Sequence, residues 1–143
     1  MKPVLIVASP YYADIHAMLL AGAERALKDA GVPYEITLMP GALEIPAAIA
    51  IAQRSGNFSG FVALGCVIRG ETHHFDIVAN ESARGLMDIA VREAVAIGNG
   101  ILTTENEAQA LLRADPTQGN KGGEAAKAAI ALMNHQSKRG ARA

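Results

Sequence analysis

Short apolar runs alternate along this chain with longer segments of helical periodicity, and this alternation constrains the fold more than any other feature. Val4 to Ala8, Tyr34 to Met39, Gly60 to Gly65 and Gly100 to Thr103 have the length and composition of buried strands. Each connection between them is long enough to cross the sheet as a helix. The pattern predicts an α/β fold, a three-layer α/β/α sandwich around a four-stranded parallel sheet.

Helix ends are marked by residues with known cap preferences. Gly31 stands where a left-handed cap would end the first helix, and Pro46 falls in the first turn of the second. Thr104-Glu-Asn-Glu107 has the spacing of a capping box, which predicts a helix N-terminus at Thr104. The expected helices cover about 14–30, 45–55, 75–95, 104–114 and 124–136, and the basic tail 137–143 is expected to fray.

The composition narrows the class of ligand. The 143 residues suit a single domain spanning 1–143, half of them are hydrophobic, and the net charge is −1. No basic face suggests nucleic acid or a membrane, so we expect a small-molecule ligand. Cys66 is the single cysteine, and the run Val4 to Ala8 is too short for a signal peptide or a membrane span. These features favour a cytoplasmic protein.

Ligands of parallel α/β sheets bind beyond the carboxyl ends of the strands, and the loop after the third strand is the most informative one. Gly70-Glu-Thr72 precedes a helix start, where free backbone N–H groups and the helix dipole favour an anion. Arg113 and Arg69 are competing candidates for the cation that a phosphate would need. The alternative is a turn that simply starts a helix, with Arg113 as a solvated charge.

His74 lies near the same predicted helix start and can shuttle a proton beside a bound phosphate ester. The alternative is that His73 and His74 are capping or surface residues. A metal site formed by His73, His74 and Asp76 is disfavoured, because adjacent histidines usually point apart, and we propose no metal.

Two further loops contain residues suited to a heterocycle or a polyol. Glu44 can accept hydrogen bonds there, or can simply favour the helix dipole as a first-turn residue. Tyr11 and Tyr12 offer flat rings for stacking, although an aromatic at this place is as often a lid over the core.

Four motifs together resemble the 6,7-dimethyl-8-ribityllumazine synthase family of riboflavin biosynthesis, in order and at that family's spacing over nearly the whole chain. The resemblance implies a flavodoxin-like sandwich and a cofactor-free condensation of 5-amino-6-ribitylaminouracil with 3,4-dihydroxy-2-butanone 4-phosphate. The motifs are Pro40-Gly-Ala-Leu-Glu-Ile-Pro46, Gly65-Cys-Val-Ile-Arg-Gly-Glu-Thr-His-His-Phe-Asp76, Leu102-Thr-Thr-Glu-Asn106 and Asn120-Lys-Gly122.

The resemblance also implies roles for individual residues. His74 matches the proton donor and acceptor, and Tyr11 matches the aromatic residue that stacks on the pyrimidine ring. The phosphate-binding positions are Glu71, Thr72 and Arg113. The positions that hold the ring and the ribityl chain, or lie near them, are Ala42, Leu43, Glu44, Cys66, Val67, Ile68, Asn99 and Lys121.

Two residues depart from the family pattern. Asn99 stands where many members place an aromatic residue from the neighbouring subunit, so a polar contact replaces stacking. Glu71 stands where many have a small residue, so its side chain must turn away from the phosphate.

The resemblance further implies a pentamer with active sites between subunits. Pro3 leaves almost no N-terminal extension, which favours a pentamer or a pair of pentamers over a 60-subunit shell. Alternatives for the function are an archaeal-type riboflavin synthase and a non-catalytic flavin or lumazine carrier or shell protein. An electron carrier is disfavoured, because the first loop lacks the Ser, Thr and Gly residues that cradle a flavin phosphate.

Overall fold

Four parallel strands form one sheet in the order β2-β1-β3-β4. They are β1 (Val4–Ala8), β2 (Tyr34–Leu38), β3 (Gly60–Ile68) and β4 (Ile97–Thr104). The structure is a computed structural model, and it describes residues 1–140. All three strand pairs are parallel, as the alternating pattern of the sequence predicts.

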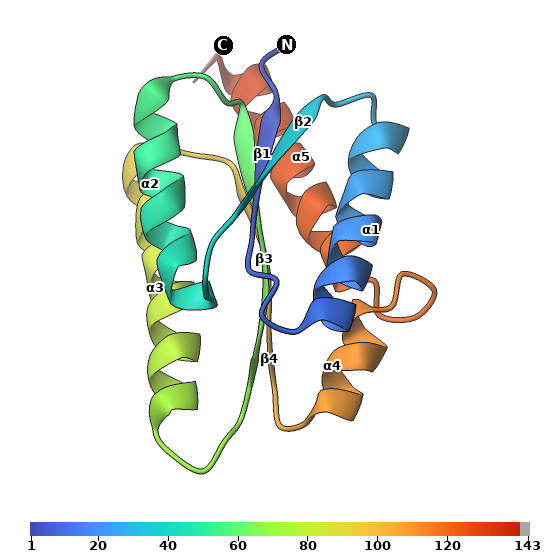
Figure 1. The fold of residues 1–143 in the computed structure, drawn as a ribbon. Coiled ribbons are helices and arrows are strands. Elements are labelled where there is room, and N and C mark those ends of the chain that lie inside the picture. The colour runs from blue at the N-terminus through green and yellow to red at the C-terminus, as the bar shows by residue number, and fades with distance from the viewer. Residues whose placement is uncertain (141–143) are drawn as a thin grey trace.

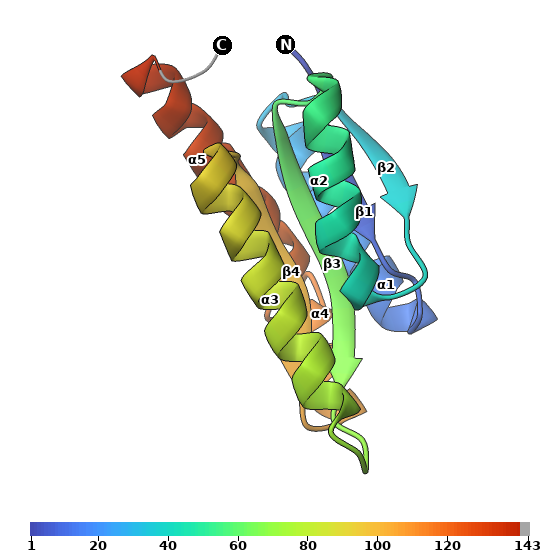
Figure 2. The ribbon, with the colours of Figure 1, turned by 90° about the vertical axis from the view of Figure 1, so that its left-hand side faces the viewer.

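The helices cover both faces of the sheet (Figure 1). One layer contains α1 (Ala13–Asp29), α4 (Glu107–Ala114) and α5 (Lys121–Arg139). The other layer contains α2 (Ile45–Ser55) and α3 (His74–Glu93), with the short 3₁₀ turn Ala42–Glu44 just before α2 (Figure 2). The three-layer α/β/α sandwich is therefore confirmed.

Alternation along the strands divides the core in two. Val4 and Ile6 of β1 pack with α1 and α5, whereas Leu5 and Val7 of the same strand pack with α2 and α3. Every residue of β1 is buried, which is why the run reads as continuously apolar rather than alternating. The two cores hold the helix layers on either side of one rigid sheet.

Several predicted helix ends are confirmed. The second helix spans Ile45–Ser55 as predicted, with proline in its first turn and Gly56 at φ 73° as a left-handed cap. Gly31 is also left-handed, at φ 70°, just beyond the end of α1. Helix α3 begins one residue before the predicted start and ends at Glu93, followed by a left-handed Ala94.

Two strands are longer than predicted. Strand β3 continues past Gly65 through Ile68, because Cys66 to Ile68 pair with Leu102 to Thr104 of β4. Strand β4 begins at Ile97 rather than Gly100. A Cβ on Gly98 would overlap the backbone carbonyl of Ala125, so this glycine permits the close approach of α5 and does not end the strand.

The last two helices differ from the prediction. The N-cap of α4 is Asn106, whose side chain accepts a hydrogen bond from the Gln109 N–H at 2.9 Å. Thr104 is instead a buried residue of β4. Helix α5 begins at Lys121 and continues to Arg139, so the part 137–139 of the predicted frayed tail is helical; residues 141–143 lie outside the described residues.

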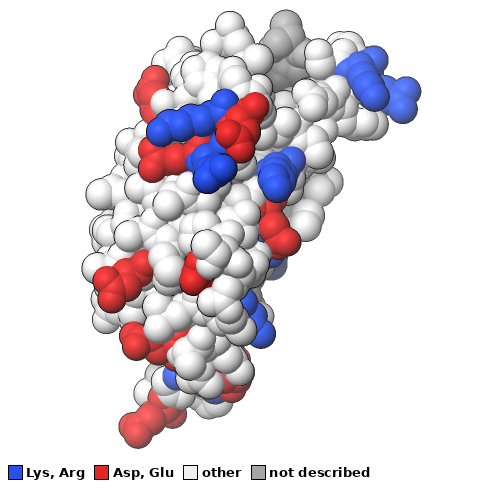
Figure 3. Space-filling view, turned by 90° about the vertical axis from the view of Figure 1, so that its right-hand side faces the viewer, with Lys and Arg blue, Asp and Glu red and all other residues white. Residues whose placement is uncertain are grey.

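Charged side chains of both signs are interspersed on the face that Figure 3 shows, and several Lys or Arg atoms lie together at one end of the molecule. Among the described residues, none of the helices is both long enough and apolar enough to cross a membrane.

Candidate functional site

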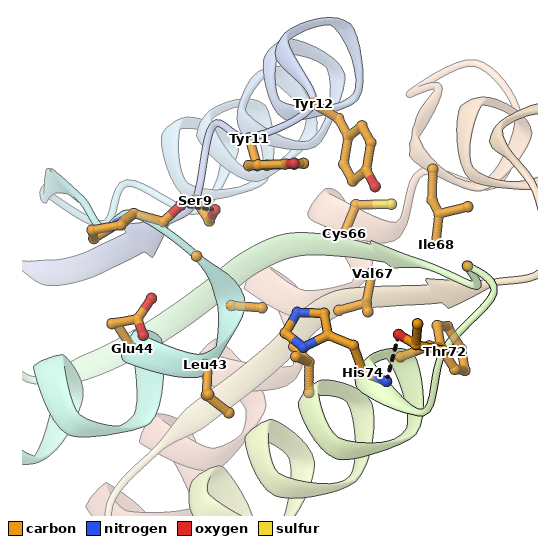
Figure 4. A pocket seen from close by; sticks show the side chains of 16 residues that line it. Ser9, Tyr11, Tyr12, Leu43, Glu44, Cys66, Val67, Ile68, Thr72 and His74 are labelled. Atoms are coloured by element: carbon orange, nitrogen blue, oxygen red, sulfur yellow. Dashed lines mark hydrogen bonds between the residues drawn. The ribbon is translucent and has the colours of Figure 1, made fainter.

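A cavity of about 410 Å³ opens at the carboxyl ends of β1, β2 and β3. The chain leaves β1 toward a helix on one face of the sheet, and it leaves the neighbouring strand β3 toward a helix on the other face. Such a switch point leaves a crevice between the diverging loops. Figure 4 shows side chains from β3, from the first turn of α3 and from the loops after β1 and β2 around this cavity.

The loop after β2 is fixed against β1. The Met39 N–H donates to the Ala8 carbonyl at 2.8 Å, and the buried Ser9 hydroxyl donates to the Pro40 carbonyl at 3.3 Å. These bonds place Ala42, Leu43 and Glu44 along one wall of the cavity. The wall therefore presents one carboxylate and mostly apolar surface.

The end of β3 forms the opposite surface with Cys66, Val67 and Ile68, all three of which line the cavity. Burial, with a smaller contribution from Glu107, raises the pKa of the Cys66 thiol to about 11. The thiol is neutral near pH 7, so it offers a polarisable contact surface rather than a nucleophile.

Two adjacent tyrosines line one side of the cavity. The rings of Tyr11 and Tyr12 meet edge to face, with centroids 5.0 Å apart. Tyr11 is 75% exposed and leaves a ring face free to stack on a planar ligand. Burial raises the pKa of the Tyr12 phenol above its ordinary value.

His74 is the first residue of α3, and its imidazole is directed into the cavity in Figure 4. Its backbone N–H donates to the Thr72 hydroxyl oxygen at 3.2 Å. His73 diverges from it, with a side chain that is 98% exposed and lies 4.0 Å from the Asp76 carboxylate. Within residues 1–140, no group of three or more His, Cys, Asp or Glu side chains is placed to hold a metal ion.

The two candidate cations lie in different places. Arg69 is engaged by the Glu105 and Asp76 carboxylates, with Nε 2.9 Å from Glu105. Arg113 lies on α4, in the helix layer across the sheet from α3, and its Nη1 donates to the Gln109 carbonyl at 3.1 Å. Neither arginine lines the cavity of its own chain.

Nine of the predicted site residues line one cavity, and four do not. Arg113 and Glu71 lie outside it, as does Lys121 at the start of α5. Asn99 is on the edge strand β4, where its side-chain oxygen accepts a hydrogen bond from the Ile101 N–H at 2.9 Å. The nine lining residues are Tyr11, Ala42, Leu43, Glu44, Cys66, Val67, Ile68, Thr72 and His74.

The cavity also contains Tyr12, which the sequence suggests as a stacking ring, and residues that the site prediction omits. Ser9 belongs to the loop after β1, whose position alone indicates proximity to a ligand. Phe75 and Val78 come from the inner face of α3. Their spacing of three residues indicates one face of a helix but does not indicate a ligand.

Fold and site together define an α/β protein with a largely apolar cavity at a topological switch point, where proteins of this class bind small molecules. The family model described as 6,7-dimethyl-8-ribityllumazine synthase matches residues 2–137.

Relatives of the same name are similar over nearly their whole length. The protein of Novosphingobium aromaticivorans is 61% identical over 133 residues, which cover 93% of this chain and 95% of that protein. The protein of Erythrobacter litoralis is 57% identical, covering 99% of this chain and all of that protein, and the protein of Zymomonas mobilis is 56% identical, covering 96% and 99%. The chain belongs to the 6,7-dimethyl-8-ribityllumazine synthase family, which confirms the predicted enzyme class, a transferase of riboflavin biosynthesis.

Proposed function

We propose that this chain condenses 5-amino-6-ribitylaminouracil with 3,4-dihydroxy-2-butanone 4-phosphate to 6,7-dimethyl-8-ribityllumazine, releasing phosphate and water. The observation that carries the proposal is that four suitable groups line one cavity. They are the aromatic ring of Tyr11, the carboxylate of Glu44, the hydroxyl of Thr72 at a helix N-terminus and the imidazole of His74. Purified protein supplied with both substrates should form the lumazine chromophore, and no product from both substrates would reject the proposal.

The cavity provides a place for each part of the two substrates. The pyrimidine ring stacks on Tyr11, while Ala42 to Glu44 and Cys66 to Ile68 hold the ring and the ribityl chain. The phosphate lies at the start of α3, where the Thr72 hydroxyl and free backbone N–H groups face it.

His74 transfers protons during the reaction. The uracil amine forms an imine with the ketone and releases water. Phosphate is then eliminated, and the resulting enol tautomerises to a new carbonyl group. The second amine attacks this carbonyl carbon and closes the ring with loss of a second water. Each step moves a proton within reach of an imidazole at the start of α3, which is the position of His74. General acid-base catalysis of this kind contributes typically ~10²- to 10⁴-fold.

The single chain leaves this site short of a cation, since neither arginine lines its cavity. We infer that Arg113, Lys121 and Asn99 reach the cavity of a neighbouring subunit in a homopentamer or a pair of pentamers. Support comes from large apolar side chains that a lone chain leaves in water, including Ile51 at 75% and Val91 at 73% exposure. Light scattering would show the mass of the assembly.

Two other functions remain distinguishable by experiment. An archaeal-type riboflavin synthase would make riboflavin from the lumazine alone, and a carrier would bind the lumazine tightly without turnover. The reported relatives are all named as lumazine synthases, which favours neither of these.

We further propose a cytoplasmic location, on the composition and the single cysteine.

A further inference from the structure

Arg69 connects three separate segments at the carboxyl edge of the sheet. Its backbone N–H donates to the Thr104 carbonyl at 2.9 Å, which extends the pairing of β3 with β4 by one residue. Its Nε donates to both carboxylate oxygens of Glu105, at 2.9 and 3.1 Å. The same guanidinium therefore joins the end of β3 to the start of the segment that leads into α4.

The guanidinium also reaches the first turn of α3. Its Nη1 lies 3.5 Å from the Asp76 carboxylate, and its carbon atom lies 4.3 Å from the centroid of the Phe75 ring. Phe75 is buried and lines the cavity. A planar guanidinium can stack on a ring and hold two carboxylates at once, whereas a lysine ammonium cannot present this geometry.

The segment between these anchors has little else to hold it. Residues 70–74 are all exposed, and this stretch includes both Thr72 and His74. Within this stretch, the His74 N–H donates a hydrogen bond to the Thr72 hydroxyl oxygen. The position of the imidazole therefore depends on how firmly the first turn of α3 is fixed at Phe75 and Asp76.

We propose that Arg69 is a positioning residue for His74, acting through Phe75 and Asp76 while Glu105 fixes its guanidinium. This inference rests on the proposed function, because His74 is the proton-transfer residue there. The proposal gives Arg69 a role other than that of a phosphate ligand, because the N–H donors of Arg69 face protein carboxylates and Arg69 does not line the cavity. An isolated exposed ion pair is weak, but here one group holds three partners from two segments.

Variants at three residues test the proposal in the assembled enzyme. Arg69→Met keeps an unbranched apolar stem and removes the guanidinium, and Glu105→Gln removes the charge that fixes it. Arg84→Met is the matched control, because Arg84 also lies between two carboxylates, Glu81 and Asp88, but on the exposed side of α3. Turnover and both Michaelis constants are measured, with the secondary structure checked by circular dichroism.

We expect Arg69→Met to lower kcat by about 10- to 100-fold with both KM values within about 3-fold of wild type, as for a catalytic group displaced by ~1 Å. Glu105→Gln should lower kcat in the same direction, and the double variant should lose little more than Arg69→Met alone. Arg84→Met should match wild type. Arg69→Lys should recover only part of the lost kcat.

An unchanged kcat in Arg69→Met would overturn the proposal. A rise in KM for the phosphorylated substrate alone would also overturn it, because that result identifies Arg69 as a phosphate ligand. If Arg69→Met does not fold, Glu105→Gln becomes the test of the proposal. An unchanged kcat in Glu105→Gln would then overturn the positioning role of Arg69. An inactive wild-type enzyme would instead reject the proposed function, so the two failures are distinguishable.

Discussion

The backbone N–H of His74 donates to the side-chain oxygen of Thr72 at 3.2 Å, so the threonine satisfies one of the free donors at the start of α3. This bond uses a lone pair of the Thr72 oxygen and leaves the hydroxyl proton free to donate to an anion. The same residue thus fixes the backbone at His74 and offers a donor to the proposed phosphate.

Replacing Thr72 by valine should therefore weaken use of the phosphorylated substrate. A hydrogen bond to a charged group contributes about 1.5–3 kcal/mol, so KM for this substrate should rise by about 10- to 100-fold. Thr72→Ser keeps the hydroxyl and should remain within a few-fold of wild type. Equal KM values for Thr72→Val and wild type, in assays that vary each substrate in turn, would contradict this role.

Removing the imidazole of His74 should slow the reaction with the fold intact. His74→Ala should lower turnover by about 10- to 10³-fold, since water replaces a positioned proton donor and acceptor. His73→Ala is the control, because that side chain is 98% exposed and outside the cavity. Similar losses in the two variants would show that neither imidazole transfers the proton.

The sequence predicted the fold well where local signals and tertiary packing agree. Helix α2 matches its prediction at both ends, because a proline in the first turn and a left-handed Gly56 mark those ends locally. The predicted bounds of strand β1 also match. A short run of apolar residues with no polar alternation is typical of a strand buried on both faces of a parallel sheet.

Two of the boundary errors lie beside glycines. The predicted fourth strand begins at Gly100 and the predicted last helix at about residue 124, whereas Gly98 lies inside β4 and Gly122 inside α5. A Cβ on Gly122 would overlap the backbone of Leu19, so this glycine allows α5 to pack closely on α1. Such a requirement depends on a segment about 100 residues away, so no local pattern reveals it.

For the site, the residues expected after β1, β2 and β3 mostly line one cavity, whereas Asn99, Arg113 and Lys121 lie outside it in the single chain. The loop after β3 was expected to begin at Cys66, whereas Cys66 to Ile68 reach the cavity as the end of the strand. The contacts of Arg69 with Glu105 depend on the pairing of β3 and β4, which a single sequence does not display.

The Cys66 thiol should react slowly with alkylating reagents in the folded protein. Its pKa of about 11, against 9.0 for the free group, lowers the thiolate fraction at pH 8 by about 100-fold, because burial penalises the charged form. The rate should rise with pH through this range. Unfolding restores the ordinary pKa, so iodoacetamide labelling followed by mass spectrometry should be about 100-fold faster in denaturant.

The same raised pKa has a consequence for stability. Between pH 9 and 11 the unfolded chain loses the thiol proton while the folded chain retains it, so this group's contribution to stability is complete below pH 9 and is lost as the pH rises to 11. Cys66→Ser should reduce this part of the pH dependence. Fast labelling of the folded protein at pH 8 would contradict the raised pKa.

Mixing two impaired variants, assayed at a low concentration of the phosphorylated substrate, tests whether neighbouring subunits share each site. His74→Ala should lower kcat, and Arg113→Ala should chiefly raise KM for the phosphorylated substrate, because the guanidinium is the proposed phosphate ligand. If the neighbour supplies Arg113, equal co-expression of the two variants restores about a quarter of the sites, since each site then draws its two groups from two randomly placed subunits. Mixing wild type with the double variant is the control, giving about a quarter active sites if they are shared and about a half if they are not. A mixture of the single variants no more active than the average of its components would show that His74 and Arg113 do not meet across a subunit contact.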